Sequence, residues 1–164
     1  MSNQLAIADS HSPAVAGGNH KEFVTMRLNG QLFGIPVNYV QDVLRPQKIA
    51  AVPLAPPEVA GLINLRGRIV TVIDMRKKLS LPENNDRTGT MMVVIEHRHE
   101  LYSLIVDSIG EVLKLSPKDF DLTPPNISSA WQAYAAGVYR LEEELMVVIE
   151  ASSLLPQESK LETV

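Results

Sequence analysis

Apolar and polar residues alternate along several short stretches of this chain, and this period of two is typical of β-strands. One alternating stretch covers 24–28 and is followed by Asn29-Gly30 and a second apolar stretch at 31–35. Asn and Gly both tolerate the positive φ that a two-residue hairpin turn requires. The pattern therefore predicts that the ordered part of the chain begins with a β-hairpin.

A second hairpin is predicted where arginines interrupt an apolar segment. The runs Leu62–Leu65 and Ile69–Ile73 read as strands, and Arg66-Gly67-Arg68 separates them. A glycine at this place suits a tight turn or a bulge. We therefore expect the two arginines to lie at an exposed hairpin tip and not in the core.

The second half of the chain shows the same pattern of short apolar stretches separated by turns. Arg98-His99 separates two apolar stretches and is expected to be another hairpin turn. The strands predicted in this half are 90–97, 100–107, 108–115, 136–142 and 145–150. Many short strands joined by Gly- and Pro-containing turns indicate small barrels or a sandwich.

Helices are expected to be few and short. Val37, Val40 and Val43 follow Pro36 at helical spacing, which predicts one short amphipathic helix over 37–44. One helical turn is predicted at 75–81, and a short helix at 151–157 that Pro156 stops. The stretch 45–61, which contains four prolines, is expected to be extended loop and edge strand, 81–89 a loop, and 116–128 a loop or a short helix. The stretch 128–137 is interpreted as a loop that leads into a strand, with Trp131 as a local core filler.

The ends of the chain differ from its middle. Residues 1–20 are small, polar and aperiodic, which predicts a flexible arm, and 158–164 is expected to be a short tail. The segment 21–157 is expected to form one domain of two closely packed halves. No apolar run reaches the length of a membrane span, so direct insertion into a membrane is not expected.

The composition of the chain argues against some classes of binding partner and some kinds of site. The chain has 164 residues with a net charge of −4, which argues against nucleic acid or an anionic membrane surface as its main partner. It contains no cysteine, which excludes disulfides, thiolate metal sites and a cysteine nucleophile. Aromatic residues make up only 5% of the sequence, so the core must be largely aliphatic.

The densest group of possible metal ligands is Glu96-His97-Arg98-His99-Glu100. The two histidines fall beside a predicted hairpin turn, and no third ligand of defined spacing stands nearby, so a solvated turn is favoured over a zinc or nickel site. No phosphate-binding loop and no G-x-S-x-G nucleophile motif occurs. No cofactor is expected, and a small β-rich metal protein or enzyme that uses 96–100 is kept as an alternative.

Read together, the residues from Val52 to Arg76 form the pattern V-P-x-A-P-P-x-x-x-G-L-I-N-L-R-G-x-I-V-x-V-I-D-M-R. This segment resembles the hallmark of the CheW family, the coupling proteins of bacterial chemotaxis. Supporting blocks follow in the family's order and spacing, at 22–35, 40–43, 104–113 and 145–155. The resemblance covers about residues 22–155, and its N-L-R-G part is the most specific.

The resemblance implies a mainly β fold of two SH3-like, five-stranded β-barrel subdomains packed over a shared hydrophobic core, with a few short helices. It implies no catalysis. Members of the family bridge the CheW-like regulatory domain of the histidine kinase CheA to the cytoplasmic tip of methyl-accepting chemoreceptors. The expected protein is a cytoplasmic adaptor that is recruited to membrane-associated receptor arrays, where other CheW-like chains are possible neighbours. The alternative function is that of an adaptor in a chemosensory-like pathway that does not control motility.

Carried over by position, the resemblance also implies a surface that contacts the receptor or the kinase. Arg66 in the N-L-R-G block is its clearest member. Asp42 stands where the family usually has glutamate, and two methionines stand where β-branched residues are more usual. The full set of implied contact residues is Val40, Asp42, Arg66, Met91, Met92 and Val112.

Overall fold

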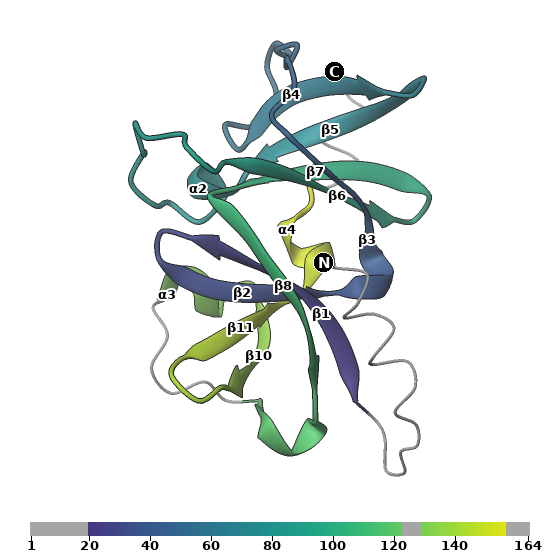
Figure 1. Ribbon diagram of the computed structural model, residues 1–164. Coiled ribbons are helices and arrows are strands. Elements are labelled where there is room, and N and C mark those ends of the chain that lie inside the picture. Colours follow the sequence, from purple (N-terminus) through teal and green to yellow (C-terminus); the bar gives the residue numbers. More distant parts are fainter. Residues whose placement is uncertain (1–19, 123–128, 157–164) are drawn as a thin grey trace.

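The computed structural model describes residues 20–122 and 129–156 (Figure 1). The predicted arm, apart from His20, and the predicted tail lie outside the described residues, as does the end of the stretch 116–128. The predicted domain boundaries therefore stay predictions.

Two antiparallel-rich sheets make up the described structure, as the strand pattern predicts. Sheet A has the spatial order β8-β1-β2-β11-β10-β9, and sheet B has the order β3-β6-β7-β5-β4. The strands of sheet A are β1 (Lys21–Leu28), β2 (Gln31–Pro36), β8 (Ser108–Leu115), β9 (Phe120–Asp121), β10 (Ala135–Arg140) and β11 (Leu145–Ile149). The strands of sheet B are β3 (Val40–Leu44), β4 (Val59–Leu65), β5 (Arg68–Asp74), β6 (Met91–His97) and β7 (Glu100–Val106).

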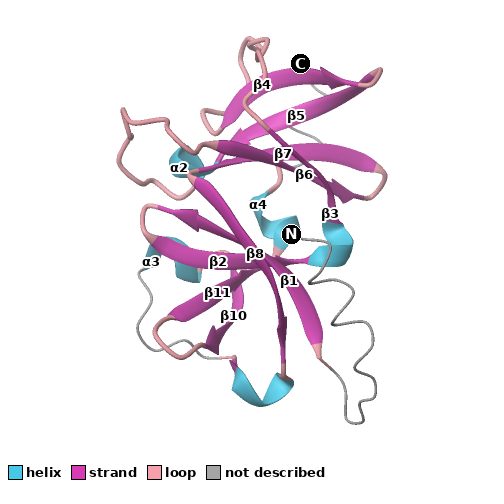
Figure 2. Cartoon of the chain, viewed as in Figure 1, coloured by secondary structure: helices cyan, strands magenta, loops and turns pink. Residues whose placement is uncertain are grey.

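Short helical turns join these strands, and Figure 2 shows how little of the chain they occupy. They are η1 (Val37–Tyr39), α2 (Met75–Lys78), η2 (Pro117–Asp119), α3 (Ser129–Gln132) and α4 (Ala151–Leu154). The mainly β class and the pair of small β units are thus confirmed. Sheet B has the five strands expected, whereas sheet A gains a sixth, the two-residue β9.

The chain passes between the two sheets twice, so sheet A is built from two separate segments, whereas sheet B is built from the continuous segment between them. It leaves sheet A after β2, crosses through η1 to form all of sheet B, and returns to sheet A through Asp107. One apolar cluster lies between the sheets and takes side chains from both, such as Phe33 and Ile73. Smaller clusters fill each unit, around Val72 in sheet B and around Met146 in sheet A. The expected shared core is therefore present.

Three hairpin turns form where the sequence predicts them. Asn29-Gly30, Arg66-Gly67 and Arg98-His99 all have positive φ at both positions, between 51° and 86°. This is the type I′ geometry whose twist matches that of the flanking strands. Arg66 is held at this tip because the N–H of Gly67 donates to the Asn64 side chain at 2.9 Å.

The helix predicted for 37–44 is wrong. Only 37–39 is helical, as η1, and 40–44 is strand β3, which pairs with β6 from Val40↔Ile95 to Leu44↔Met92. Valines at 37, 40 and 43 fit a helical period, but burial along β3 alternates residue by residue. Pairing with a strand about fifty residues away, which suits β-branched side chains, overrides the local pattern.

The loop expected at 128–137 is also partly wrong, because α3 covers Ser129–Gln132. Trp131 is 4% exposed and its ring lies 5.3 Å from that of Phe33, centroid to centroid. The expectation that Trp131 belongs to the core is therefore confirmed. The helices predicted at 75–81 and 151–157 are present as α2 and α4, each shorter than its predicted segment.

One buried hydroxyl group in sheet B lacks a partner. Ser103 on β7 is fully buried beside Val72 and Val94, and its Oγ has no hydrogen-bond partner among the described residues. We expect Ser103→Ala to raise the free energy of unfolding by up to about 1 kcal/mol, because it removes a desolvated polar group. Chemical denaturation would measure this. Ser153→Ala is the control, since its Oγ donates to the carbonyl of Glu150 at 2.6 Å and its loss should destabilise; a clear loss of stability for Ser103→Ala would contradict the prediction.

Candidate partner-binding surface

An exposed ion pair joins two of the residues that the sequence singled out. Arg66, at the β4–β5 turn, places its Nη2 2.8 Å from Oδ2 of Asp42 on β3. Strands β3 and β4 are the opposite edges of sheet B, so this pair spans the seam between the edges of the curled sheet. The hydrogen bond from Arg66 is the main reason why the pKa of Asp42 lies below its ordinary value.

The Arg66 guanidinium remains available to a partner. Its side chain is 72% exposed, whereas that of Asp42 is 27% exposed. Only one of its terminal nitrogens is used in the pair with Asp42. A guanidinium has further donors in a fixed planar fork, so Arg66 can bind a carboxylate or carbonyl of a second protein while it remains paired.

Three apolar members of the predicted set lie at the margin of the shared core. Val40 is on β3, Met91 is on β6, and Val112 is on β8 in sheet A. Each is partly buried and packs against the cluster between the sheets. The predicted surface thus draws on both sheets, and its geometry depends on how the sheets are held together.

Met92 has a different place from its neighbour Met91. It is 1% exposed, packs in the core cluster of sheet B, and accepts a hydrogen bond on its Sδ from the N–H of Gln47 at 3.3 Å. In this structure the side chain offers almost no surface to a partner. Met92 lies opposite Leu44 in the pairing of β6 with β3.

A second, more buried ion pair fastens the two sheets together, and sequence reasoning missed it. Asp107, at the return crossover, accepts hydrogen bonds from Nε and Nη2 of Arg76 at 3.1 and 2.6 Å, and from the N–H of Asn29 at 2.8 Å. Arg76 belongs to α2 beside sheet B, whereas Asn29 is in the β1–β2 turn of sheet A. Burial, the largest single influence, raises the pKa of Asp107, but the bonds from Arg76 and Asn29 and the Arg76 charge together bring it below its ordinary value.

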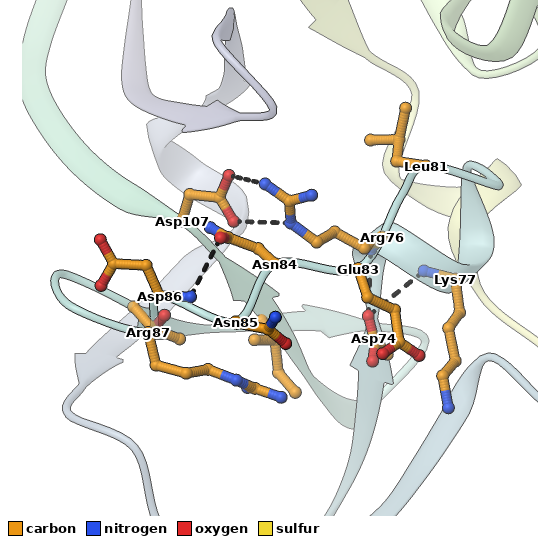
Figure 3. Close-up of a pocket in the computed structure, with 12 residues that line it drawn as sticks. Asp74, Arg76, Lys77, Leu81, Glu83, Asn84, Asn85, Asp86, Arg87 and Asp107 are labelled. Carbon is orange, nitrogen blue, oxygen red and sulfur yellow. Dashed lines mark hydrogen bonds and ion pairs between the residues drawn. The ribbon is translucent and has the colours of Figure 1, made fainter.

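This ion pair borders a polar cavity of about 250 Å³ (Figure 3). The loop after α2 forms much of the wall, and Figure 3 shows acidic and basic side chains interspersed around it. Asp74 at its edge caps α2 by accepting from the N–H groups of Arg76 and Lys77. Acidic and basic side chains are mixed along the wall, so its charge favours no single class of ligand.

The other side of α2 is also tied to sheet A. The hydroxyl of Tyr134, which lies just before β10, donates to the carbonyl of Lys78 at 3.4 Å. The Lys78 ammonium lies 5.7 Å from the centre of the Tyr134 ring and 3.6 Å from a carboxylate oxygen of Glu58. No short sequence motif marks these links, because the groups are separated by many residues along the chain.

The histidine cluster lies at the tip of the β6–β7 hairpin. His97 ends β6, and Arg98-His99 forms the turn. Across residues 20–122 and 129–156, no three His, Cys, Asp or Glu side chains are grouped so that they could hold a metal ion. A search of the same residues found no helix long and apolar enough to span a membrane.

These features define a β-rich binding domain: two sheets over a shared core, with an exposed arginine at a hairpin tip. The model of the CheW-like domain family matches residues 22–159, and this chain belongs to that family.

Individual relatives agree with this assignment. The chain is 29% identical over 139 residues to the chemotaxis protein CheW of Bacillus subtilis, covering 85% of this chain and 89% of that protein. It is 26% identical over 146 residues to the CheW of Treponema pallidum, covering 87% and 86%. The crystal structure of the scaffolding protein TtCheW from Thermoanaerobacter tengcongensis matches with a TM-score of 0.77 at 24% identity, over 85% of this chain and 94% of that one, and so supports the fold.

Proposed function

We propose that this chain is a non-catalytic adaptor that couples the cytoplasmic tips of chemoreceptors to a CheA-type histidine kinase in bacterial chemotaxis. Membership of the CheW-like domain family supports the proposal. The observation that links the proposal to a particular residue is the exposure of Arg66, which lies in the N-L-R-G segment and is oriented by its ion pair with Asp42.

The proposed receptor contact uses the margin between the sheets. A receptor tip is a helical hairpin, and one helical face can lie against apolar side chains such as Val40 and Val112 while Arg66 binds a carboxylate or a carbonyl at its edge. Val40 and Val112 pack against the shared core, so their positions are fixed before a partner binds. An adaptor of this kind requires surfaces that bind its partners and does not require a catalytic site.

The proposed kinase contact is with the kinase's own CheW-like regulatory domain. Contacts of one adaptor with each partner are individually modest, and simultaneous contacts in an array increase the overall affinity. In this proposal the chain itself does not insert into the membrane and is recruited to receptor arrays through its partners, where other CheW-like chains could also be neighbours.

Reversal of the charge at Arg66 tests the proposal directly. We expect Arg66→Glu to weaken binding to a receptor cytoplasmic fragment, with the kinase present, by about 1–3 kcal/mol, because it removes a charge-assisted hydrogen bond and introduces repulsion. The free energy of unfolding should fall by no more than about 1 kcal/mol, since exposed ion pairs contribute little. Titration and chemical denaturation of the same preparation measure the two effects.

The matched control is Lys118→Glu, an equal charge reversal at an exposed residue of η2 beside sheet A. It should change neither quantity appreciably. Binding of Arg66→Glu at the parent's affinity would remove Arg66 from the contact surface. A parent protein that bound neither receptor fragment nor kinase would overturn the proposed function itself.

A further inference from the structure

A cavity of about 290 Å³ lies beside sheet A, and aromatic side chains form much of its wall. The rings of Phe23 and Phe120 lie 5.3 and 5.1 Å from that of Tyr139, centroid to centroid, and all three side chains line the cavity. Lys21 and Glu150 are the charged members among the lining residues that the structure describes. The wall therefore suits an uncharged, largely apolar ligand.

One polar group in this wall has no partner. Tyr139 is 4% exposed, and within residues 20–122 and 129–156 its hydroxyl makes no hydrogen bond. Unlike Oγ of Ser103, this hydroxyl is not fully shielded from solvent, and its side chain lines the cavity. Burial and the charge of Asp119 raise the pKa of Tyr139, so the hydroxyl remains a donor at neutral pH. A ligand with a carbonyl oxygen would supply the acceptor that the described fold does not.

The chain's own N-terminal arm begins at the rim of this cavity. Lys21, the first residue of β1, lines the cavity, and residues 1–19 precede the described structure. Gly17-Gly18 stands just before β1, and glycine readily adopts the positive φ of a tight reversal. The residues from Val15 to Lys21 span at most about 20 Å, so Val15 stays within reach of the cavity. Such a short tether gives the segment before the glycines an effective concentration in the millimolar range.

The segment Pro13-Ala14-Val15-Ala16 has the chemistry that the cavity wall suits. Residues 10–19 contain no Asp, Glu, Lys or Arg, so docking of this segment would bury no charged side chain. Proline favours the extended polyproline conformation, whose backbone carbonyls have no internal hydrogen bonds. Grooves lined by aromatic side chains bind segments of this kind. The other apolar group of the arm, Leu5-Ala6-Ile7, is further from Lys21 along the chain and is followed by Asp9.

We propose that segment 13–16 of the N-terminal arm docks in the aromatic cavity of the same chain, where one of its backbone carbonyls accepts a hydrogen bond from the Tyr139 hydroxyl. Pro13 and Val15 lie against the rings of the wall, and the chain reverses at Gly17-Gly18 to reach Lys21. The arm thereby covers an aromatic surface, and a protein that binds this surface has to displace the arm first. This docking requires neither receptor nor kinase, so it goes beyond the proposed function and can be tested without either partner.

A spin label next to the segment tests the docking in the full chain. Because the sequence contains no cysteine, Ser12→Cys provides a single attachment site for a nitroxide label. In nuclear magnetic resonance spectra the label should broaden the amide signals of Ala136 and Ala151, which line the cavity. The signals of Leu62 and Asn64 on β4, the strand at the top of the molecule in Figure 1, should keep their intensity. Unbroadened signals of Ala136 and Ala151 would overturn the proposal.

Two substitutions in the arm separate the proposed segment from the rest of it. Val15→Asp places a carboxylate against the aromatic wall and should lower the equilibrium constant of docking about tenfold or more, so that most of the broadening is lost. Leu5→Asp is the matched control, because it makes the same kind of change outside the segment, and it should leave the broadening as it is. Equal losses for the two variants would exclude segment 13–16 as the occupant of the cavity.

Tyr139→Phe tests the hydrogen bond, because it keeps the ring in the wall and removes only the hydroxyl. It should lower the equilibrium constant of docking about fivefold, and undiminished broadening in this variant would overturn the assigned hydrogen bond. A mixture of spin-labelled chain with isotopically labelled chain that lacks the spin label reports contacts between copies. Broadening in this mixture would mean that the arm of a second copy occupies the cavity, and would overturn docking within one chain.

Discussion

Replacement of Ile73 by alanine is expected to lower the free energy of unfolding by about 3 kcal/mol. Ile73 lies on β5 between Val59 on β4 and Leu104 on β7, and it is fully buried in the cluster between the two sheets. Truncation removes buried methyl and methylene groups and leaves a cavity that the surrounding strands fill only partly. Because this cluster joins both sheets, the loss should appear as one cooperative transition in urea denaturation.

The same strand provides the control. Ile69 is four residues earlier on β5 and is 60% exposed. Ile69→Ala removes the same atoms from a solvated position, so its effect should stay within about 0.5 kcal/mol. Equal losses for the two variants would mean that burial does not decide the cost, and separate transitions for the two sheets would show that the shared core does not couple them.

Local signals in the sequence were sufficient for the hairpins. Asn29-Gly30 and Arg66-Gly67 contain residues that suit two-residue turns, and the flanking apolar runs identify the strands. Arg98-His99 has no glycine, yet the apolar strands on both sides of it place the turn. These predictions succeed because each hairpin is specified by residues that are adjacent along the chain.

Distant pairing accounts for what the sequence could not show. The segment 37–44 has apolar residues at a helical period, and only its pairing with β6 makes 40–44 a strand. Arg66 and Asp42 were both expected in the contact surface, but their ion pair depends on the curvature of sheet B, which brings its two edges together.

The largest electrostatic effect is expected at Asp107. Asp107→Asn should lower the free energy of unfolding by about 2 kcal/mol, because it leaves the Arg76 guanidinium partly buried without its counter-charge. The side chains of Arg76 and Asp107 are only 15% and 26% exposed, so water compensates poorly for the lost partner. This loss in the free energy of unfolding is smaller than that expected for a fully buried pair, because Arg76 and Asp107 border a polar cavity. Chemical denaturation at neutral pH would measure it.

The same pair should influence stability in acid. The folded-state pKa of Asp107 lies below its ordinary value: burial raises it, but the hydrogen bonds from Arg76 and Asn29 and the Arg76 charge outweigh that effect. The folded state therefore binds this proton less readily than the unfolded state, so the stabilisation is present above about pH 4 and is lost as the pH falls through the folded-state pKa. The Asp107→Asn variant should lose less stability than the parent over this acidic range. Asp42 and Glu144, whose pKa values are also lowered, will keep part of the acid sensitivity.

The ion pair between Arg27 and Glu144 is the control for the pair between Arg76 and Asp107, because its geometry is similar but it is more exposed. It too has two hydrogen bonds, at 3.0 and 2.7 Å, but its side chains are 42% and 39% exposed. Glu144→Gln should therefore cost no more than about 0.5 kcal/mol, since water screens an exposed pair and solvates the remaining guanidinium. If both variants lost the same stability, the position of Asp107 between the sheets would have no special importance. If only Asp107→Asn were destabilised, the contacts of Asp107 with Arg76 and Asn29 would be shown to hold the two sheets together, in addition to the shared core.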